Sequence, residues 1–394
     1  MNGKCSIFFE KRKTCGSKNS LFRHFNNFFA RKGGISTFNA LYLNSFLYKA
    51  TSLEMKRLIV LAYAVFSTIA LCAGNGLSAY TFLEMPPSAY SAAQGGQNVA
   101  LSHDGVNNVF SNAALISEKE NKQLSLSYSR YLNIANFGGA AYSQTWNSHT
   151  FSGGVRFLNY GQFSGCDEYG ASTGTFTATD VEMVFSYSRM LYKGLSAGVS
   201  FKPIFSVYEN YGSFALAVDV AAAYVCDKYS LSTGLAFQQI GRQVVTYDDD
   251  VQALPFNMVF SINKGFKHAP VILHFTYNHI TDWDFDYVNK VSATNMLGVK
   301  QSSKISGVDM FFRHTIWGVD FVPFGGKFRV SASYNHRRAQ ELKLSDAKTI
   351  AGFSFGAGLY LKKFNLSMAA SQYQSGVWNW QFNVGLDFDK ILKR

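Results

Sequence analysis

Long apolar runs are almost absent from this sequence. Although 47% of its 394 residues are hydrophobic, only residues 58–73 approach the roughly 18 apolar residues that a membrane-spanning helix needs. A bundle of membrane helices is therefore excluded. This run follows Met55, Lys56 and Arg57 and ends in the small residues 74–76, an arrangement typical of a secretory signal peptide.

We expect a signal peptide at 55–79, with a membrane anchor as the alternative interpretation. Residues 1–54 then precede the signal, and we interpret them as a mis-assigned N-terminal extension, with Met55 as the true start. Of the formal net charge of +12, seven charges come from 1–54 and two from Lys56 and Arg57. The remaining +3 gives no reason to expect a nucleic-acid partner.

Cysteine is also scarce. Of five cysteines, only Cys166 and Cys226 lie beyond the expected leader. Two cysteines are too few for a disulfide framework or a zinc knuckle. One bridge in an oxidising periplasm and two free thiols both fit the sequence.

Residues with catalytic or metal-binding chemistry form no convincing group. The acidic run 248–250 lacks the spaced ligands of a calcium site, so we interpret it as a solvated loop. A strand would turn His268, His274 and His279 to different depths and faces. We therefore expect no catalytic residue, no metal site and no cofactor.

Many segments of the sequence alternate apolar residues with small or polar residues at a period of two. In 351–361, Phe353, Phe355 and Leu359 share one face, whereas Ser354 and several glycines occupy the other. Because side chains alternate across a strand, such a segment has one greasy face and one small or polar face. We interpret the greasy face as lipid-facing and the polar face as lumen-facing.

Fourteen strand-like runs follow the leader. They span residues 121–130, 135–146, 148–160, 176–192, 195–208, 212–225, 229–240, 255–265, 269–280, 305–321, 327–337, 348–361, 364–372 and 376–388. An even number of strands suits a closed bacterial barrel. We therefore predict an all-β fold, a 14-stranded antiparallel transmembrane β-barrel over residues 121–390.

The connections between these runs also alternate in length. Tight turns are expected at 147, 193–194, 227–228, 267–268, 325–326 and 362–363. The longest links, on the other rim, are 161–175, 241–254, 281–304 and 338–347. Short periplasmic turns opposite long extracellular loops are typical of a transmembrane barrel. A soluble β-sandwich gives no reason for this regularity and is the competing fold class.

The segment 80–120 differs from the rest of the chain. Pro86-Pro87, Gly95-Gly96 and Asn112-Ala113-Ala114 interrupt any strand pattern. We expect this segment to form a plug or hatch inside the barrel.

Short stretches between residues 80 and 360 carry a family resemblance through their order along the chain. They are 82–83, 87–89, 95–96, 157–161, 167–170, 213–219, 254–256, 268–270, 283–284, 312–314, 334–338, 341–344 and 352–356. In this order they resemble the PorQ family of the type IX secretion system and, more distantly, the PorV group. One departure is Asn112-Ala113-Ala114, where the family has Asn-Pro-Ala, so the rigidity that proline gives this turn is missing.

The resemblance implies a FadL-like barrel and a non-enzymatic role in the outer membrane of a Gram-negative bacterium. It also implies work with PorU, PorV and PorZ in an attachment complex, which processes exported cargo and joins it to anionic lipopolysaccharide. The alternative function is a FadL-like channel for hydrophobic small molecules, in which segment 80–120 would gate the lumen. Such a transporter predicts an apolar pocket at the plug.

Two stretches are candidates for partner binding. Residues 282–285 combine acidic groups with aromatic anchors, as a docking surface would, although an ordinary barrel loop is the interpretation that we favour slightly. Residues 336–338 end an expected strand, where they could meet lipopolysaccharide or an acidic partner, or act only as snorkelling cations. The candidates are Asp282, Trp283, Asp284, Phe285, His336, Arg337 and Arg338.

Overall fold

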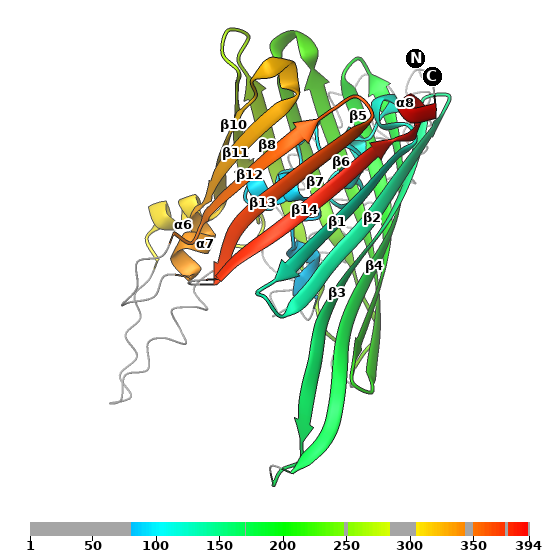
Figure 1. The fold of residues 1–394 in the computed structure, drawn as a ribbon, viewed down its shortest axis with the longest axis vertical. Helices are drawn as coiled ribbons and strands as arrows, with labels where there is room; N and C mark the ends of the chain where they lie inside the picture. The colour runs from blue at the N-terminus through cyan, green and yellow to red at the C-terminus, as the bar shows by residue number, and fades with distance from the viewer. Residues whose placement is uncertain are drawn as a thin grey trace, which may run out of the picture. The chain divides into compact units, whose positions relative to one another are not determined.

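A computed structural model describes residues 80–169, 171–247, 251–283, 305–342, 350–374 and 377–392. Its strands form one closed antiparallel barrel, in which each strand pairs with its sequence neighbours and β1 pairs with β14 (Figure 1). The predicted 14-stranded barrel is therefore confirmed. The expected extension 1–54 and signal peptide 55–79 lie outside the described residues.

The elements follow one another in simple order. The strands are β1 (Gln123–Tyr131), β2 (Ala135–Trp146), β3 (His149–Cys166), β4 (Ser172–Tyr192), β5 (Leu195–Tyr208), β6 (Tyr211–Cys226), β7 (Leu231–Val245), β8 (Asn257–Gly265), β9 (Val271–Tyr277), β10 (Thr315–Phe321), β11 (Phe328–Asn335), β12 (Phe353–Tyr360), β13 (Phe364–Gln374) and β14 (Val377–Asp387). The short helices are η2 (Thr81–Glu84), α4 (Ala89–Ala93), η3 (Gly105–Phe110), η4 (Ala113–Leu115), η5 (Glu118–Glu120), η6 (Asp227–Tyr229), α6 (Gly307–Arg313), η7 (Phe324–Gly326), α7 (His336–Glu341) and α8 (Phe388–Leu392).

The alternation has the predicted sense. On β1, Leu126 and Tyr128 are 47% and 49% exposed, whereas Ser125 and Ser129 are buried. The same holds on β14, where Phe382 points outward. An outward apolar surface on a closed barrel matches a lipid environment, in which every strand edge must also be paired. Among the described residues, no helix has the length and apolar character to cross a bilayer.

Two rims can be distinguished by their connections. The turn rim carries the short turns after β2, β4, β6, β8, β10 and β12, and also the start of β1 and the end of β14. The loop rim carries the remaining links, including α6 and α7. The predicted alternation of tight turns with other links is confirmed, although the lengths at the loop rim differ from the prediction.

The interpretation of 161–175 as a long loop is wrong. β3 continues to Cys166 and β4 begins at Ser172, so the link spans only 167–171. The register shifts between Asn159 and Gln162, and Gly161 has a φ of +87°. This β-bulge interrupts the period-two pattern. The predicted strand therefore stops at residue 160, although β3 continues to Cys166.

Two expected strands also proved to be partly helical. Residues 307–313 of the run 305–321 form α6, in which Asp309 and Arg313 make an i,i+4 ion pair of 2.9 Å. Residues 336–337 of the run 327–337 begin α7, because the Asn335 side chain accepts a hydrogen bond from the Arg338 backbone N–H and caps the helix. The apolar stretch of α6 is too short to separate strand from helix, and the polar residues of α7 form no apolar pattern of either period.

The expected plug-like segment is present inside the barrel. Residues 80–120 run as short helices and turns against the inward face of the strands (Figure 1). One apolar cluster joins the plug residues Tyr80, Phe82 and Leu83 to Phe137 and Ile204 of the wall. The best-buried apolar core of the molecule is therefore the contact between plug and wall.

Candidate functional site

Glycines of the wall allow the plug backbone to approach closely. A Cβ built on Gly198 would lie 2.5 Å from the Ala114 backbone nitrogen, and one on Gly356 would lie 2.5 Å from the Ala93 Cβ. A Cβ on Gly234 would overlap the Val99 carbonyl oxygen. Glycine at these wall positions therefore leaves room that the plug fills.

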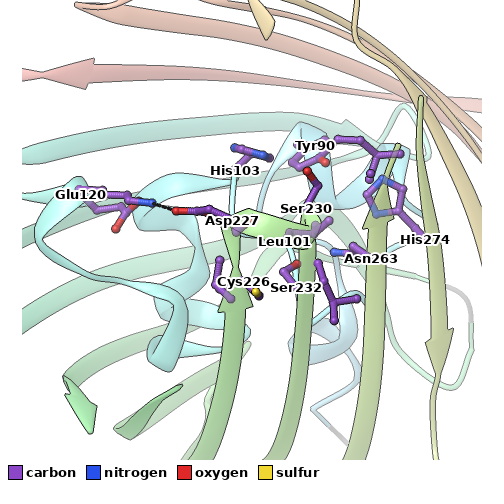
Figure 2. Close-up of a pocket in the computed structure, with 16 residues that line it drawn as sticks. Tyr90, Leu101, His103, Glu120, Cys226, Asp227, Ser230, Ser232, Asn263 and His274 are labelled. Atoms are coloured by element: carbon purple, nitrogen blue, oxygen red, sulfur yellow. Dashed lines mark ion pairs between the residues drawn. The ribbon is translucent and has the colours of Figure 1, made fainter. Parts of the chain in front are cut away.

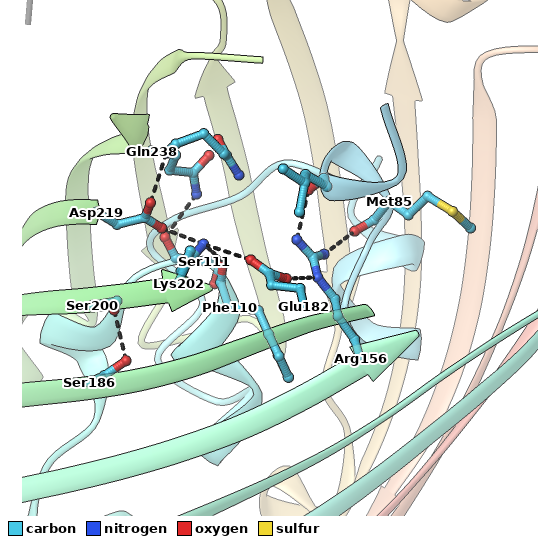
Figure 3. Close-up of polar contacts among 12 residues, drawn as sticks. Met85, Phe110, Ser111, Arg156, Glu182, Ser186, Ser200, Lys202, Asp219 and Gln238 are labelled. Carbon is cyan, nitrogen blue, oxygen red and sulfur yellow. Dashed lines mark hydrogen bonds and ion pairs between the residues drawn. The ribbon is translucent and has the colours of Figure 1, made fainter. Parts of the chain in front are cut away.

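A buried ion network connects four neighbouring strands to the plug (Figure 3). Lys202 of β5 lies between Glu182 of β4 and Asp219 of β6, with Nζ–O distances of 3.5 and 2.5 Å. Arg156 of β3 pairs with the other oxygen of Glu182. All four side chains are at most 5% exposed.

The two cations of this network also hold the plug backbone. Arg156 Nη1 and Nη2 donate to the carbonyl oxygens of Met85 and Leu83 at 3.0 and 2.9 Å. Lys202 Nζ donates to the carbonyl oxygen of Phe110 at 3.2 Å. Two cations and two carboxylates balance in charge, so the network has no net charge to attract a counter-ion. Removing one partner of such a buried pair costs about 3–5 kcal/mol.

A second polar network holds the plug on β9, β10 and β11. Asp320 accepts a hydrogen bond of 2.7 Å from the Tyr90 hydroxyl and another from the Gln94 side chain. His274 Nε2 lies 3.0 Å and Arg329 Nη1 3.3 Å from the same carboxylate. The Arg329 guanidinium also covers the Tyr90 ring at 4.6 Å. The plug is thus anchored on two separate parts of the wall.

At the loop rim, an open cavity of about 350 Å³ lies between the plug and the wall. Plug residues Glu84 and Met85 line it together with Tyr160 and with Arg337 and Arg338 of α7. Charged and aromatic side chains therefore face the same space. Sequence reasoning placed the two arginines near a rim but did not place them against the plug.

Arg338 connects α7 to the plug and the wall. Its Nη2 donates to the Gly95 carbonyl oxygen at 3.1 Å, and its Nη1 donates to Ser354 Oγ at 3.2 Å. The guanidinium also lies 4.2 Å from the centre of the Tyr373 ring. This arginine is held by intramolecular contacts and acts first as a structural link.

The other two basic candidates on α7 have acidic neighbours. Arg337 Nε donates to Glu341 at 2.7 Å, and His336 Nε2 lies 2.9 Å from Asp309 of α6. His336 therefore joins α6 to α7. The three candidates 336–338 share one helix, but each meets a different group.

The candidates at 282–285 are only partly described. Asp282 and Trp283 follow β9 and are exposed, while Asp284 and Phe285 lie outside the described residues. The Trp283 ring packs against His314 with centroids 4.6 Å apart, and its Nε1 donates to the Ile280 carbonyl oxygen at 2.9 Å. This tryptophan is 50% exposed, so part of its ring is accessible at the loop rim.

The plug candidates Asn112, Ala113 and Ala114 form a capped turn. The Asn112 side chain accepts a hydrogen bond from the Ala114 backbone N–H at 3.0 Å, and its Nδ2 donates to the Val99 carbonyl oxygen at 2.7 Å. All three residues are buried. These contacts hold the turn in place without the proline that the resembled family has there.

A cavity of about 370 Å³ lies at the turn rim (Figure 2). Its lining mixes His103 and Glu120 of the plug segment with Cys226, Asp227 and His274 of the wall. Within the described residues, no three His, Cys, Asp or Glu side chains are arranged to hold a metal ion. Cys226 at this rim and Cys166 on β3 are both free thiols, which decides between the two cysteine interpretations.

Asp104 of the plug is a buried acid near the turn rim. Ser88 Oγ lies 2.8 and 2.7 Å from its carboxylate oxygens, and Asn107 Nδ2 donates to it at 3.2 Å. Burial raises the pKa of Asp104 to about 7, against the opposing effect of these hydrogen bonds. Asp104 therefore changes its charge near neutral pH.

Gly-x-Ser-x-Gly spacing occurs at 170–174, 194–198 and 352–356. A nucleophile elbow requires a strand-to-helix turn, whereas Ser172, Ser196 and Ser354 all lie on strands of the wall. Ser196 Oγ donates to the Ala114 carbonyl oxygen, and Ser354 Oγ accepts from Arg338. These serines hold the plug and α7 in place.

Sequence reasoning missed the two buried networks. A signal was present, because Lys202 directly follows the lipid-facing Phe201 and Arg156 directly precedes the lipid-facing Phe157. A charged residue on the lumen face of such a strand predicts an internal partner. The identity of the partners required the barrel register.

No protein-family model and no curated protein sequence matches the chain. Among solved structures, it is similar to the Pseudomonas putida toluene transporter TodX, with a TM-score of 0.46 and 10% identity over 76% of this chain and 97% of that one. The CymD monoaromatic hydrocarbon channel gives 0.45 and 11% over 76% and 96%. A Pseudomonas aeruginosa FadL homologue gives 0.41 and 10% over 76% and 98%. Similarities this low carry no argument about function, and the fold here is established by the strand pairing itself.

Proposed function

We propose that this chain is a non-enzymatic outer-membrane component of the type IX secretion system, supporting cargo processing and cell-surface attachment. In this role it holds another component at the surface, and PorU, PorV and PorZ are the expected partners. The family resemblance supports the choice of system. The observation that carries a holding role, rather than transport, is the way in which the plug is fastened inside the barrel.

The contacts of the plug support a closed lumen. Arg156 and Lys202 bind plug carbonyl groups from one part of the wall, and Asp320 binds Tyr90 and Gln94 from another. A gate that moves aside would have to break these hydrogen bonds, each worth about 1.5–3 kcal/mol where one partner is charged. The wall glycines add tight steric contact.

The cavities mix charged and apolar side chains. A channel for hydrophobic molecules would need an apolar pocket at the plug. The loop-rim cavity is lined by Glu84, Arg337 and Arg338 together with Phe82, Leu158 and Ile316, and the turn-rim cavity by His103, Lys119 and Asp227 together with Leu101, Val225 and Ile272. The fastening of the plug, rather than the lining of the cavities, therefore supports a holding role.

Two features at the loop rim, one exposed and one half-buried, are proposed to contact a partner. Trp283 offers a half-exposed ring beside Asp282, and aromatic anchors with polar surroundings are frequent in protein interfaces. Because Arg338 is held by the plug and wall, we assign contact with anionic lipopolysaccharide or an acidic partner to His336 and Arg337 rather than to Arg338.

The test is affinity purification of the tagged chain from membranes, with the co-purifying proteins identified. We expect PorU, PorV or PorZ to be recovered, and we expect deletion of the chain to release surface-attached proteins into the medium. Trp283→Ala should reduce recovery, whereas Trp146→Ala, an exposed tryptophan at the end of β2 on the turn rim, should not. Uptake of a labelled hydrophobic ligand that depends on the barrel, without any co-purifying secretion protein, would instead support the FadL-like channel.

A further inference from the structure

β3 and β4 extend beyond the strands on either side of them (Figure 1). The pairing of β2 with β3 ends at Asn136 and Asn159, and the pairing of β4 with β5 begins at Ala178 and Tyr208. Past these points, 162–166 pairs only with 172–177. We call the described residues 162–169 and 171–177 the ribbon.

Each strand of the ribbon has one outer edge without a strand partner in the described part of the chain. One backbone contact reaches its base, where the Glu209 N–H donates to the Thr177 carbonyl oxygen at 3.1 Å. Beyond it, Gln162–Gly165 pairs in regular register with Gly174–Thr177. Unpaired edge groups of this kind are a template for another strand.

The ribbon lacks the charges and prolines that often protect a strand edge, although its segments are short and a β-bulge lies at its base. Natural proteins block edges with lysine, proline, inward charges, β-bulges, very short strands or a covering element. Neither 162–166 nor 172–177 contains a charged residue or a proline. Three threonines of β4, which favour extended backbone, are Thr173, Thr175 and Thr177. Both segments are largely exposed.

The side chains of the ribbon add apolar contact area. The rings of Phe163 and Phe176 stack with centroids 5.3 Å apart. Phe163 is 41% exposed and lies beyond the rim of β2. A strand added to the edge would therefore gain side-chain contact as well as backbone hydrogen bonds.

Charge distinguishes between the occupants that such an edge could take. Residues 157–178 contain no lysine, arginine or histidine, whereas Asp167 and Glu168 lie at the tip. A second copy of this chain would bring like charges together if the two ribbons paired. An extended segment with lysine or arginine beside its strand would be attracted instead.

We propose that the ribbon is a strand-addition site for an extended, basic-flanked segment of another protein. The partner strand pairs with the outer edge of β3 or β4 at the loop rim, and its basic residues lie near Asp167 and Glu168. This inference deepens the proposed function and rests on it only in taking the partner to be a protein.

The test uses the detergent-solubilised full chain and a fluorescent peptide, Lys-Thr-Val-Thr-Val-Thr-Lys. Anisotropy should show saturable binding. The same peptide with N-methyl groups on alternate residues keeps its side chains but loses the donors of one edge, so we expect at least about a tenfold weaker affinity. Equal binding of both peptides would refute strand addition, and this comparison needs no altered protein.

Two variants locate the binding on the molecule. Joining Gln162 to Thr177 through an Asn-Gly turn removes the ribbon at a paired position and fits a two-residue hairpin. This variant should lose the peptide, whereas Phe163→Ser, which keeps both edges, should stay within about threefold of the wild type, a change of at most about 0.65 kcal/mol. Retained binding by the shortened chain, or equal loss in both variants, would overturn the proposal.

Two further measurements test the charge preference of the site and the self-association of the barrel. A peptide with glutamate in place of both lysines should bind about two- to fivefold more weakly. Dimers of the barrel that disappear in the shortened variant would assign the edge to a second copy and contradict the proposal. The peptide experiment contains no secretion protein. A failure of peptide binding therefore does not change the expected recovery of PorU, PorV or PorZ. Likewise, a failure to recover these proteins does not change the peptide result.

Discussion

The plug and the ribbon both have backbone polar groups that no neighbouring strand pairs, but these groups are satisfied in different ways. In the plug, carbonyl groups that no strand can satisfy are bound by Arg156, Lys202 and other side chains of the wall. In the ribbon, the outer-edge groups are left without a strand partner in the described residues. Buried polar groups must be paired within the molecule, whereas exposed ones can use water or a partner. The plug is therefore held by contacts within the molecule, whereas the edges of the ribbon can pair with another strand.

The largest change in stability should come from removing a cation that binds the plug. Lys202→Met leaves the buried carboxylate of Asp219 without its ion pair, and we expect a loss of about 3–5 kcal/mol in the free energy of unfolding. Urea titration in detergent micelles, followed by tryptophan fluorescence, measures it.

The matched control for this change is Lys327→Met, because Lys327 is exposed on the turn before β11. The free energy of unfolding of Lys327→Met should lie within about 0.5 kcal/mol of the wild-type value. Adding Asp219→Asn to Lys202→Met should recover part of the loss, since the uncompensated charge is then absent. Equal midpoints for the two lysine variants would show that the network does not hold the plug.

A smaller effect is expected from filling the space that a wall glycine leaves. The new Cβ of Gly234→Ala would overlap the Val99 carbonyl oxygen of the plug, and overpacking of this kind costs about 1–3 kcal/mol. Gly212→Ala on β6 is the control, because its Cβ would have no atom within 4 Å. Midpoints of urea unfolding compare the two, and a Gly234→Ala midpoint as high as that of Gly212→Ala would contradict close packing.

The charge of Asp104 should make the plug sensitive to pH. Because burial raises the pKa of Asp104 from 3.8 to about 7, the folded chain binds this proton more tightly than the unfolded chain. Its stabilising contribution is complete below about pH 4 and is lost as the pH rises through about 7, by at most about 1.4 kcal/mol per pH unit.

Asp104→Asn should remove this part of the pH dependence. Urea midpoints measured from pH 4 to pH 8 for both chains give the difference, which should grow in favour of the variant as the pH rises. A difference that stays constant over this range would show that Asp104 does not titrate in the folded chain.

The smallest expected effect concerns the ribbon. The Gln162-to-Thr177 shortened chain should unfold within about 0.5 kcal/mol of the wild type, because the removed residues are exposed and contribute little packing. Thermal unfolding in micelles tests this. A large loss of stability would mean that the ribbon supports the barrel, and the contrast with the plug would then fail.

Much of the wall could be predicted from local pattern. The bounds of β2 and β5 agree with the predicted runs 135–146 and 195–208, because clear alternation there ends at turns with positive φ, such as Asn147 and Gly194. The pattern failed where it was interrupted. The bulge at Gly161 hid the extension of β3. The short apolar stretch of α6 and the polar sequence of α7 gave no helical period.

The candidate site was predictable only in part. Arg337 and Arg338 were found as a basic pair near a rim, but the contact of Arg338 with Gly95 joins residues more than 240 positions apart, which no local pattern encodes. Likewise, the free thiols of Cys166 and Cys226 could not be told from a bridge by spacing alone.

Local sequence is enough to specify strands with one apolar and one polar face, since side-chain alternation is a local property of extended backbone. It also determined the order of the strands, because short turns join sequence neighbours. The pairing of the lumen charges, the attachment of the plug and the unpaired strand edges are visible only in the folded barrel. These depend on closure of the barrel and on its register, which bring together residues that are distant in sequence.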